Sequence, residues 1–371
     1  MATIQTKGLT YRYGIGTPFE KTAVDHVDLE IESGSFVGII GHTGSGKSTL
    51  IQHLNGLLKP TEGSILLDGK DIWAEKAQMR QVRFRVGLVF QYPEHQLFAE
   101  TVYKDVAFGP RNLGLSGKEV DALVRSSLER VGLSFDELAE KSPFELSGGQ
   151  QRRVAFAGVL AMDPQVLVLD EPAAGLDPAS KRSFLEMISR LHDQGLTVVM
   201  VSHCMDDLAA MCDRVAVMSA GHILQLGTPE DIYNEPQSAF VADFIGDSDI
   251  MAGTMVRDKL VRFLGCDFPC VDTGFGENAD VDVVLRPEDV KLKPADDPVQ
   301  GVPQGVVESL LFKGVHYEMK VRVGDNVLLV HSTHARPVGT QVKLTVAPED
   351  IQVMRKSDYS PDILKRHAAR V

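Results

Sequence analysis

The feature that most constrains the fold is the segment 41–49, which reads G-H-T-G-S-G-K-S-T. It fits the pattern G-x-x-x-x-G-K-[ST] of a phosphate-binding loop. The apolar run F-V-G-I-I at 36–40 predicts a buried strand, and residues 50–58 predict a helix. Because strand, loop and helix follow in the order that the motif requires, we expect an α/β P-loop NTPase core.

The residue types in this loop suit a nucleotide. Glycines let several backbone N–H groups point at a phosphate, and the following helix contributes its positive end. Lys47 is expected to reach the β- and γ-phosphates, and the Ser48 hydroxyl to bind Mg²⁺. Tyr13 lies upstream, where its ring can stack on an adenine or simply pack on an edge strand. The expected nucleotide-binding residues are Tyr13, Gly41, His42, Thr43, Gly44, Ser45, Gly46, Lys47, Ser48 and Thr49.

Length and charge restrict the possible functions. The chain has 371 residues, which suggests two domains, and a formal net charge of −13. An acidic chain is a poor partner for nucleic acid, which favours a basic face. No apolar signal core opens the sequence and no run is long enough for a membrane span, so any membrane role is expected to come through partners.

The pattern of elements changes along the chain. Apolar runs at 166–170 and 197–201 predict buried parallel strands, and residues about 92–160 are mostly helical. Beyond position 236, short β-rich segments are separated by Gly and Pro turns, which predicts a small all-β, OB-like barrel. We therefore expect a nucleotide-binding domain at 1–236 with a helical subdomain at about 92–160, a linker at 237–249, a barrel at 250–355 and a polar tail at 356–371.

Six elements occur in a fixed order. They are G-H-T-G-S-G-K-S-T at 41–49, Gln91, L-S-G-G-Q at 146–150, V-L-V-L-D-E at 166–171, G-L-D at 175–177 and His203. In this order they resemble the Walker A motif, Q-loop, signature, Walker B motif, D-loop and switch histidine of the ATP-binding-cassette (ABC) ATPases. The resemblance covers roughly residues 1–235, and its joint match is very specific.

The resemblance implies a role for each matching residue. Glu171 is the general base that polarises the attacking water, His203 hydrogen-bonds the γ-phosphate, and Gln91 contacts the metal or that water. Ser48, Gln91 and Asp170 are the implied ligands of Mg²⁺. The reaction is therefore expected to be hydrolysis of ATP with Mg²⁺.

The signature implies a partner. In ABC proteins it completes the ATP site of the opposite subunit, so Ser147, Gly148, Gly149 and Gln150 are expected to contact nucleotide held by a second cassette, in a homodimer or heterodimer. Asp177 is the implied D-loop residue of the same interface.

Two further resemblances point to different cargo. Residues 41–60 and F-Q-Y-P-E-H-Q-L-F-A-E-T-V at 90–102 resemble the ATPases of energy-coupling-factor (ECF) importers of vitamins, cobalt or nickel. The segments 227–236, 240–246 and L-R-P-E-D at 285–289 resemble the accessory domain of polyamine importer ATPases. The segment 92–98, and in particular Leu97 and Phe98, is expected to dock on a membrane subunit, with packing inside the helical subdomain as the alternative.

These observations predict the ATPase subunit of a bacterial ABC importer, peripheral at the cytoplasmic face of the cell membrane. An ECF-type importer is favoured and a polyamine importer is the alternative. A soluble ABC ATPase of DNA repair or translation is disfavoured, because about a hundred residues without heptads separate the loop at 41–49 from the signature. An ATP-binding regulator that does not hydrolyse is disfavoured by Glu171 and His203.

Overall fold

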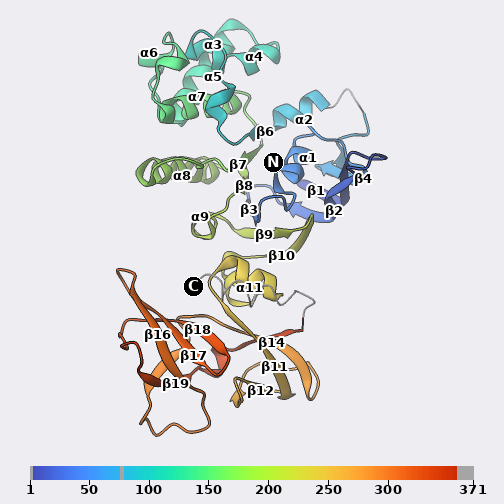
Figure 1. Ribbon diagram of the computed structural model, residues 1–371. Helices are drawn as coiled ribbons and strands as arrows, with labels where there is room; N and C mark the ends of the chain where they lie inside the picture. Colours follow the sequence, from blue (N-terminus) through green and yellow to red (C-terminus); the bar gives the residue numbers. More distant parts are fainter. Residues whose placement is uncertain (1–2, 76–78, 357–371) are drawn as a thin grey trace. The chain divides into compact units, whose positions relative to one another are not determined.

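The computed structural model describes residues 3–75 and 79–356. The chain divides into two compact units, Met1–Pro229 and Glu230–Val371. In Figure 1 the first unit runs from blue to yellow-green and the second from yellow to red. The expected tail lies, apart from Lys356, outside the described residues.

A six-stranded sheet in the order β10-β9-β3-β8-β7-β6 forms the centre of the first unit. Five strands run parallel and β10 pairs antiparallel at one edge. Every residue of β3, β7 and β8 is buried, as expected for parallel strands covered on both faces. The strands are β3 (Phe36–Gly41), β6 (Val86–Val89), β7 (Val166–Asp170), β8 (Thr197–Val201), β9 (Arg214–Ser219) and β10 (His222–Gly227).

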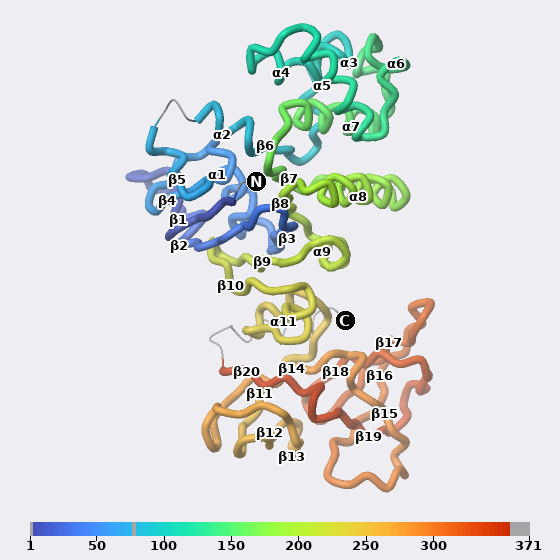
Figure 2. Tube along the Cα trace, turned by 180° about the vertical axis from the view of Figure 1, so that it is seen from behind, coloured from blue at the N-terminus to red at the C-terminus, as the bar shows by residue number. Residues whose placement is uncertain are grey.

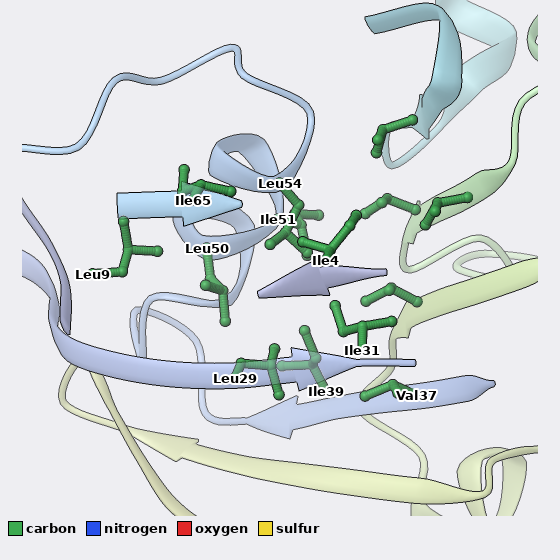
Figure 3. Close-up of a cluster of buried hydrophobic side chains, with 14 of the residues drawn as sticks. Ile4, Leu9, Leu29, Ile31, Val37, Ile39, Leu50, Ile51, Leu54 and Ile65 are labelled. Atoms are coloured by element: carbon green, nitrogen blue, oxygen red, sulfur yellow. The ribbon is translucent and has the colours of Figure 1, made fainter. Parts of the chain in front are cut away.

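A second sheet, antiparallel and in the order β2-β1-β4-β5, completes the core of this unit. Figure 3 shows apolar side chains of both sheets and of helix α1 meeting between them, among them Ile4, Ile39 and Leu50. This core holds α1, and with it the loop before α1, in a fixed place. The elements are β1 (Ile4–Tyr13), β2 (Lys21–Ile31), α1 (Lys47–Leu54), β4 (Glu62–Leu67), β5 (Lys70–Asp71) and α2 (Met79–Arg85).

A helical subdomain is inserted between β6 and β7 and gathers at one end of the first unit (Figure 2). Its elements are η2 (Pro93–Gln96), α3 (Val102–Val106), α4 (Phe108–Asn112), α5 (Gly117–Arg130), α6 (Phe135–Leu138), η3 (Pro143–Glu145) and α7 (Gly148–Leu160). On α5, Val120, Val124 and Leu128 are buried at helical spacing. Helices α8 (Pro178–Asp193) and α9 (Met205–Met211) follow β7 and β8.

The second unit consists mainly of two antiparallel five-stranded sheets, in the orders β13-β12-β11-β14-β20 and β15-β19-β16-β17-β18. Their inner faces share one apolar core that includes Met255, Val283 and Val321, which confirms the predicted all-β barrel. The strands are β11 (Asp249–Arg257), β12 (Leu260–Phe263), β13 (Cys266–Pro269), β14 (Ala279–Leu285), β15 (Lys291–Pro294), β16 (Gln304–Phe312), β17 (Tyr317–Val323), β18 (Asn326–Ser332), β19 (Gln341–Thr345) and β20 (Gln352–Arg355). The short helix η4 (Pro348–Asp350) precedes β20.

The segment 237–249 differs from the expected linker. It contains helix α11 (Ala239–Ile245), preceded by α10 (Pro229–Asn234). Arg286, 3% exposed, donates hydrogen bonds to Ala242 O at 3.0 Å and to Ser248 Oγ at 2.5 Å. These bonds, and the small apolar cluster that Ala239 and Ala242 form with Ile250, Val284 and Met354, hold α11 against the sheet, so α11 is part of the second unit.

None of the helices in the described parts of the chain is long and apolar enough to span a membrane.

Candidate active site

The phosphate-binding loop connects the end of β3 to the start of α1. Gly46 caps α1 with φ of 104°, and a Cβ there would lie 2.3 Å from Ala23 O. A Cβ at Gly41 would lie 2.3 Å from Met218 O. Both positions therefore require glycine, because neighbouring backbone leaves no room for a side chain.

Lys47 occupies the centre of the loop. Its side chain is 5% exposed, and Nζ donates to Gly41 O at 2.7 Å and to His42 O at 2.9 Å. Burial lowers the pKa of Lys47, and the nearby carboxylates of Glu171 and Asp170 oppose that shift. A buried cation held only by neutral carbonyls is well placed to exchange them for phosphate oxygens.

Ser48 and Asp170 provide oxygen ligands of the kind that Mg²⁺ prefers. The Ser48 hydroxyl donates a hydrogen bond to the Asp170 carboxylate, which is 7% exposed at the end of β7. Burial raises the pKa of Asp170, the hydrogen bond from Ser48 lowers it, and the adjacent Glu171 raises it. A divalent cation would relieve this desolvated carboxylate, so the two residues fit the expected metal.

Glu171 brings together the three residues expected to be catalytic. Gln91 Nε2 donates to Glu171 Oε2 at 3.1 Å, and His203 Nε2 contacts Glu171 Oε1. The backbone of Glu171 has φ of 48°, a left-handed conformation that costs energy for a residue with a side chain. Its N–H donates to Val201 O at 3.1 Å, which holds this conformation in place. Gln91, Glu171 and His203 thus meet at the carboxyl ends of three parallel strands.

The signature residues lie apart from this site in the same chain. In Figures 1 and 2, α7 belongs to the group of helices at one end of the unit, away from α1. Ser147 caps α7 in a capping box with Gln150, whose backbone N–H donates to Ser147 Oγ at 3.4 Å. Asp177 caps α8, where its Oδ1 accepts from Ala179 N at 3.0 Å and Ser180 N at 3.1 Å.

Tyr13 lies at the end of β1, close to the loop. Its hydroxyl is 3.2 Å from Thr49 Oγ1, and its ring meets the Tyr11 ring edge-on at 4.8 Å. Tyr13 is 43% exposed, so part of its surface is accessible to a planar ligand beside the loop.

We expect Tyr13→Ala to weaken ATP binding by about 1–3 kcal/mol, the usual contribution of one base stacked on an aromatic ring. Tyr13→Phe is the matched control, since it keeps the ring and removes the bond to Thr49. Isothermal titration of the purified chain with ATP measures both. If alanine leaves the affinity unchanged, or phenylalanine is as harmful as alanine, the ring does not stack on the base.

Arg152 is a residue that sequence reasoning missed. Its guanidinium, 4% exposed, donates to both carboxylate oxygens of Glu94 at 3.0 and 2.6 Å. It also donates to Pro172 O at 3.2 Å and Ala174 O at 2.8 Å, directly after Glu171. One buried arginine therefore joins the signature helix, the segment after Gln91 and the segment after Glu171. An arginine two residues after L-S-G-G-Q was visible in the sequence, but nothing local pairs it with Glu94.

Comparisons with known proteins agree with this geometry. The sequence model of the ABC transporter family matches residues 24–174, and that of the TOBE domain matches residues 283–354. The energy-coupling factor transporter ATP-binding protein EcfA2 of Clostridium perfringens is 52% identical over 237 residues, 64% of this chain and 83% of the relative. The spermidine/putrescine import ATP-binding protein PotA of Bacteroides fragilis is 42% identical over 355 residues, 95% of this chain and 74% of the relative. The chain belongs to the ABC transporter ATP-binding proteins.

Solved structures of this family support the assignment. The cassette cbiO1 from Clostridium perfringens, described as part of the ABC transporter complex cbiONQ, is 38% identical with a TM-score of 0.57, over 62% of this chain and 90% of that one. A bacterial ABC transporter cassette solved as a dimer is 30% identical with a TM-score of 0.55, over 61% of this chain and 98% of that one. The predicted ABC cassette fold is confirmed.

Family membership settles the general activity. This ABC protein is an ATP hydrolase coupled to transport. Both halves of the predicted resemblance are present, because the EcfA2 match spans 237 residues whereas the PotA match, at 355 residues, includes the barrel.

Proposed function

We propose that this chain is the ATP-hydrolysing subunit of an importer with an ECF-type membrane partner, which holds it at the cytoplasmic face of the cell membrane. The observation that carries the choice of partner is the exposed aromatic pair Phe98 and Phe108 in the helical subdomain that follows Gln91. It is supported by the 52% identity of the EcfA2 match over 237 residues. Hydrolysis itself is attributed to residues around Glu171.

In the proposed reaction, Glu171 accepts a proton from the water that attacks the γ-phosphate. Its two carboxylate oxygens are engaged by Gln91 and His203, so these side chains orient the base until substrate arrives. Lys47 exchanges its carbonyl partners for phosphate oxygens. Ser48 and Asp170, with Gln91 beside them, would hold Mg²⁺, which when bound would supply positive charge to the phosphates. The contacts of Gln91 and His203 therefore hold the Glu171 carboxylate in position before ATP binds.

The second cassette is proposed to use the signature of this chain. Ser147, Gly148 and Gly149 are exposed, and a Cβ at either glycine would meet nothing within 4 Å. No close contact within residues 3–75 and 79–356 requires either of the two adjacent glycines at the start of α7. Close approach of a partner's phosphate to the backbone N–H groups would explain both, together with the helix N-terminus.

The docking surface is proposed to centre on Phe98. Its side chain is 61% exposed and meets the Phe108 ring edge-on at 5.0 Å, with Phe108 itself 52% exposed. Phe98 N and Ala99 N both donate to Asp105 Oδ2 at 2.9 Å, so the loop presents the ring in a fixed orientation. An aromatic pair exposed on a rigid loop is suited to fill a groove on another protein.

The expectation that Leu97 docks on a membrane subunit is wrong. Leu97 is 7% exposed and packs inside the helical subdomain. The neighbouring Phe98 points outward instead, because the two residues follow the end of η2 with opposite orientations. Docking is therefore assigned to Phe98 and Phe108 rather than to Leu97 and Phe98.

We expect Phe98→Asp to abolish co-purification with an ECF-type transmembrane protein while ATP affinity stays unchanged. A central aromatic anchor contributes about 2 kcal/mol or more, or about 30-fold in affinity. Phe312→Asp in the barrel is the matched control, because Phe312 is 59% exposed and lies outside the cassette. Co-expression followed by affinity purification of the tagged membrane protein measures the outcome.

A polyamine importer is the second candidate. It is favoured by the PotA match, which runs over 95% of this chain and therefore includes the barrel. If the full chain is retained by a polyamine permease pair and not by the ECF-type protein, the polyamine assignment replaces the one proposed above. Loss of retention with Phe312→Asp but not with Phe98→Asp would likewise place docking on the barrel.

A further inference from the structure

Three aromatic rings form a row that connects β1 to α1 beside the phosphate-binding loop. Tyr11 and Tyr13 are two positions apart on β1, so their side chains lie on the same face of that strand. The Tyr11 ring meets the Tyr13 ring edge-on at 4.8 Å between centroids, and it meets the His53 ring of α1 at 4.8 Å with a tilt of 69°. Leu9 of β1 and Leu50 of α1 belong to one apolar cluster, which holds the two elements together (Figure 3). Tyr11 therefore joins the Tyr13 ring to the helix that follows the loop.

The three rings lead from the core to the surface. His53 is fully buried, Tyr11 is half-buried against the apolar core, and Tyr13 is half-exposed. A half-exposed side chain can occupy several rotamers unless neighbouring groups restrict it. The contact with Tyr11 is such a restriction, because a Tyr13 side chain that rotates away gives up the favourable edge-on geometry of an aromatic pair.

Both ends of this row are tied to Thr49, the last residue of the loop motif at 41–49. His53 Nδ1 donates a hydrogen bond to Thr49 O at 2.7 Å, and the Tyr13 hydroxyl lies 3.2 Å from Thr49 Oγ1. Tyr13, Tyr11, His53 and Thr49 thus form a closed circle of contacts. Because each member of a closed circle restrains the next, the helix that begins at Lys47 also sets the orientation of the Tyr13 ring.

Stability alone does not explain a histidine at position 53. His53 Nε2 is buried and has no hydrogen-bond partner in the described parts of the chain. A buried polar atom without a partner destabilises the fold, and an apolar side chain of similar size would avoid that cost. Burial also lowers the pKa of His53, although the bond to Thr49 opposes the shift, so the ring is neutral near pH 7. The imidazole provides what an aliphatic side chain would not, a flat ring for Tyr11 together with a donor to Thr49 O.

We infer that Tyr11 and His53 are positioning residues for the nucleotide base: they hold the Tyr13 ring in the orientation that stacks on the base of ATP. A ring that is already fixed loses little rotamer freedom when the base binds, so the base binds more tightly. Neither residue needs to touch the nucleotide for this effect. The inference rests on the stacking of Tyr13 in the proposed nucleotide site, and it adds that affinity for the base depends on contacts behind that ring.

Isothermal titration of the full chain with two ligands tests this role. ADP and pyrophosphate, each with Mg²⁺, share a diphosphate and differ by adenosine, and ADP avoids the turnover of ATP during the measurement. The affinity for pyrophosphate is obtained by competition with ADP. A residue that acts on the base lowers the affinity for ADP alone, whereas a residue that only supports the fold of the loop lowers the affinity for both ligands.

Tyr11→Leu and His53→Leu are each expected to lower the affinity for ADP about three- to tenfold, as for loss of one edge-on aromatic contact, with the affinity for pyrophosphate unchanged. Tyr11→Phe keeps the ring and should bind ADP like the native chain. Tyr103→Leu removes a ring on α3, in the helical subdomain, and should also bind ADP like the native chain. In a chain that already carries Tyr13→Ala, Tyr11→Leu should cause no further loss, because it acts through the Tyr13 ring.

These variants separate the inference from the stacking on which it rests. If Tyr13→Ala lowers the affinity for ADP but Tyr11→Leu and His53→Leu do not, the stacking stands and the inference is overturned. It is likewise overturned if the two leucine variants weaken pyrophosphate as much as ADP, if Tyr11→Phe or Tyr103→Leu is as harmful as Tyr11→Leu, or if the effects of Tyr11→Leu and Tyr13→Ala add. If Tyr13→Ala leaves the affinity for ADP unchanged, the stacking itself is refuted and the inference fails with it.

Discussion

Replacement of Glu171 by glutamine is expected to lower the rate of ATP hydrolysis about 10²–10⁴-fold, the usual contribution of a positioned general base. The amide keeps the size of the side chain and can still contact Gln91 and His203, but it cannot accept a proton. ATP affinity should therefore stay close to that of the native chain, and an ATP-bound dimer should accumulate. Steady-state phosphate release and size-exclusion chromatography with ATP measure the two effects.

The control for this experiment is Glu137→Gln, which neutralises an exposed carboxylate on α6. It should leave both turnover and dimerisation unchanged. Native-like hydrolysis by Glu171→Gln would refute the role of Glu171 as base. Loss of ATP binding in that variant would mean that the residue holds the site together instead.

Replacement of Arg152 by methionine is expected to lower the free energy of unfolding of the chain by about 3–5 kcal/mol, as when one partner of a buried ion pair is removed. Arg152 is 4% and Glu94 16% exposed, so the orphaned carboxylate stays largely shielded from water. The carbonyls of Pro172 and Ala174 also lose their donor. Urea denaturation followed by circular dichroism measures the change.

Two further variants serve as controls for this prediction. Arg152→Met combined with Glu94→Leu should be less destabilised than Arg152→Met alone, because no buried carboxylate is left without a partner. Arg125→Met breaks the exposed pair with Asp136 and should have a far smaller effect, since water screens that pair. If the double variant is as unstable as the single one, the loss is due to packing and not to the ion pair.

Contiguous stretches of sequence determined the cassette's central strands and loops. The runs at 166–170 and 197–201 are strands β7 and β8 with the same bounds, and 36–40 is β3 extended by one residue. These segments are apolar on both faces, so any fold that buries them must place them inside a covered sheet. The proposed catalytic residues Gln91, Glu171 and His203 were chosen from the resemblance to ABC ATPases. They lie together because the carboxyl ends of neighbouring parallel strands meet at one edge of the sheet.

Only the tertiary structure decided which neighbours in the sequence face inward. Leu97 and Phe98 are adjacent and both apolar, yet one is 7% and the other 61% exposed. Periodicity cannot assign faces in a loop that follows a single turn of 3₁₀ helix, because no repeating geometry links one position to the next. The segment 237–249 was misjudged for a related reason, since helix α11 is held by Arg286, a residue some forty positions away.

The sequence also did not show which residues far apart along the chain would pair with one another. Arg152 and Glu94 are 58 residues apart, and they meet only because α7 packs against η2. Local sequence thus determined the residue types, strands and loops that carry phosphate chemistry, because backbone geometry and burial are encoded over a few residues. Which charges are buried together depends on how distant segments pack, and only the fold sets that.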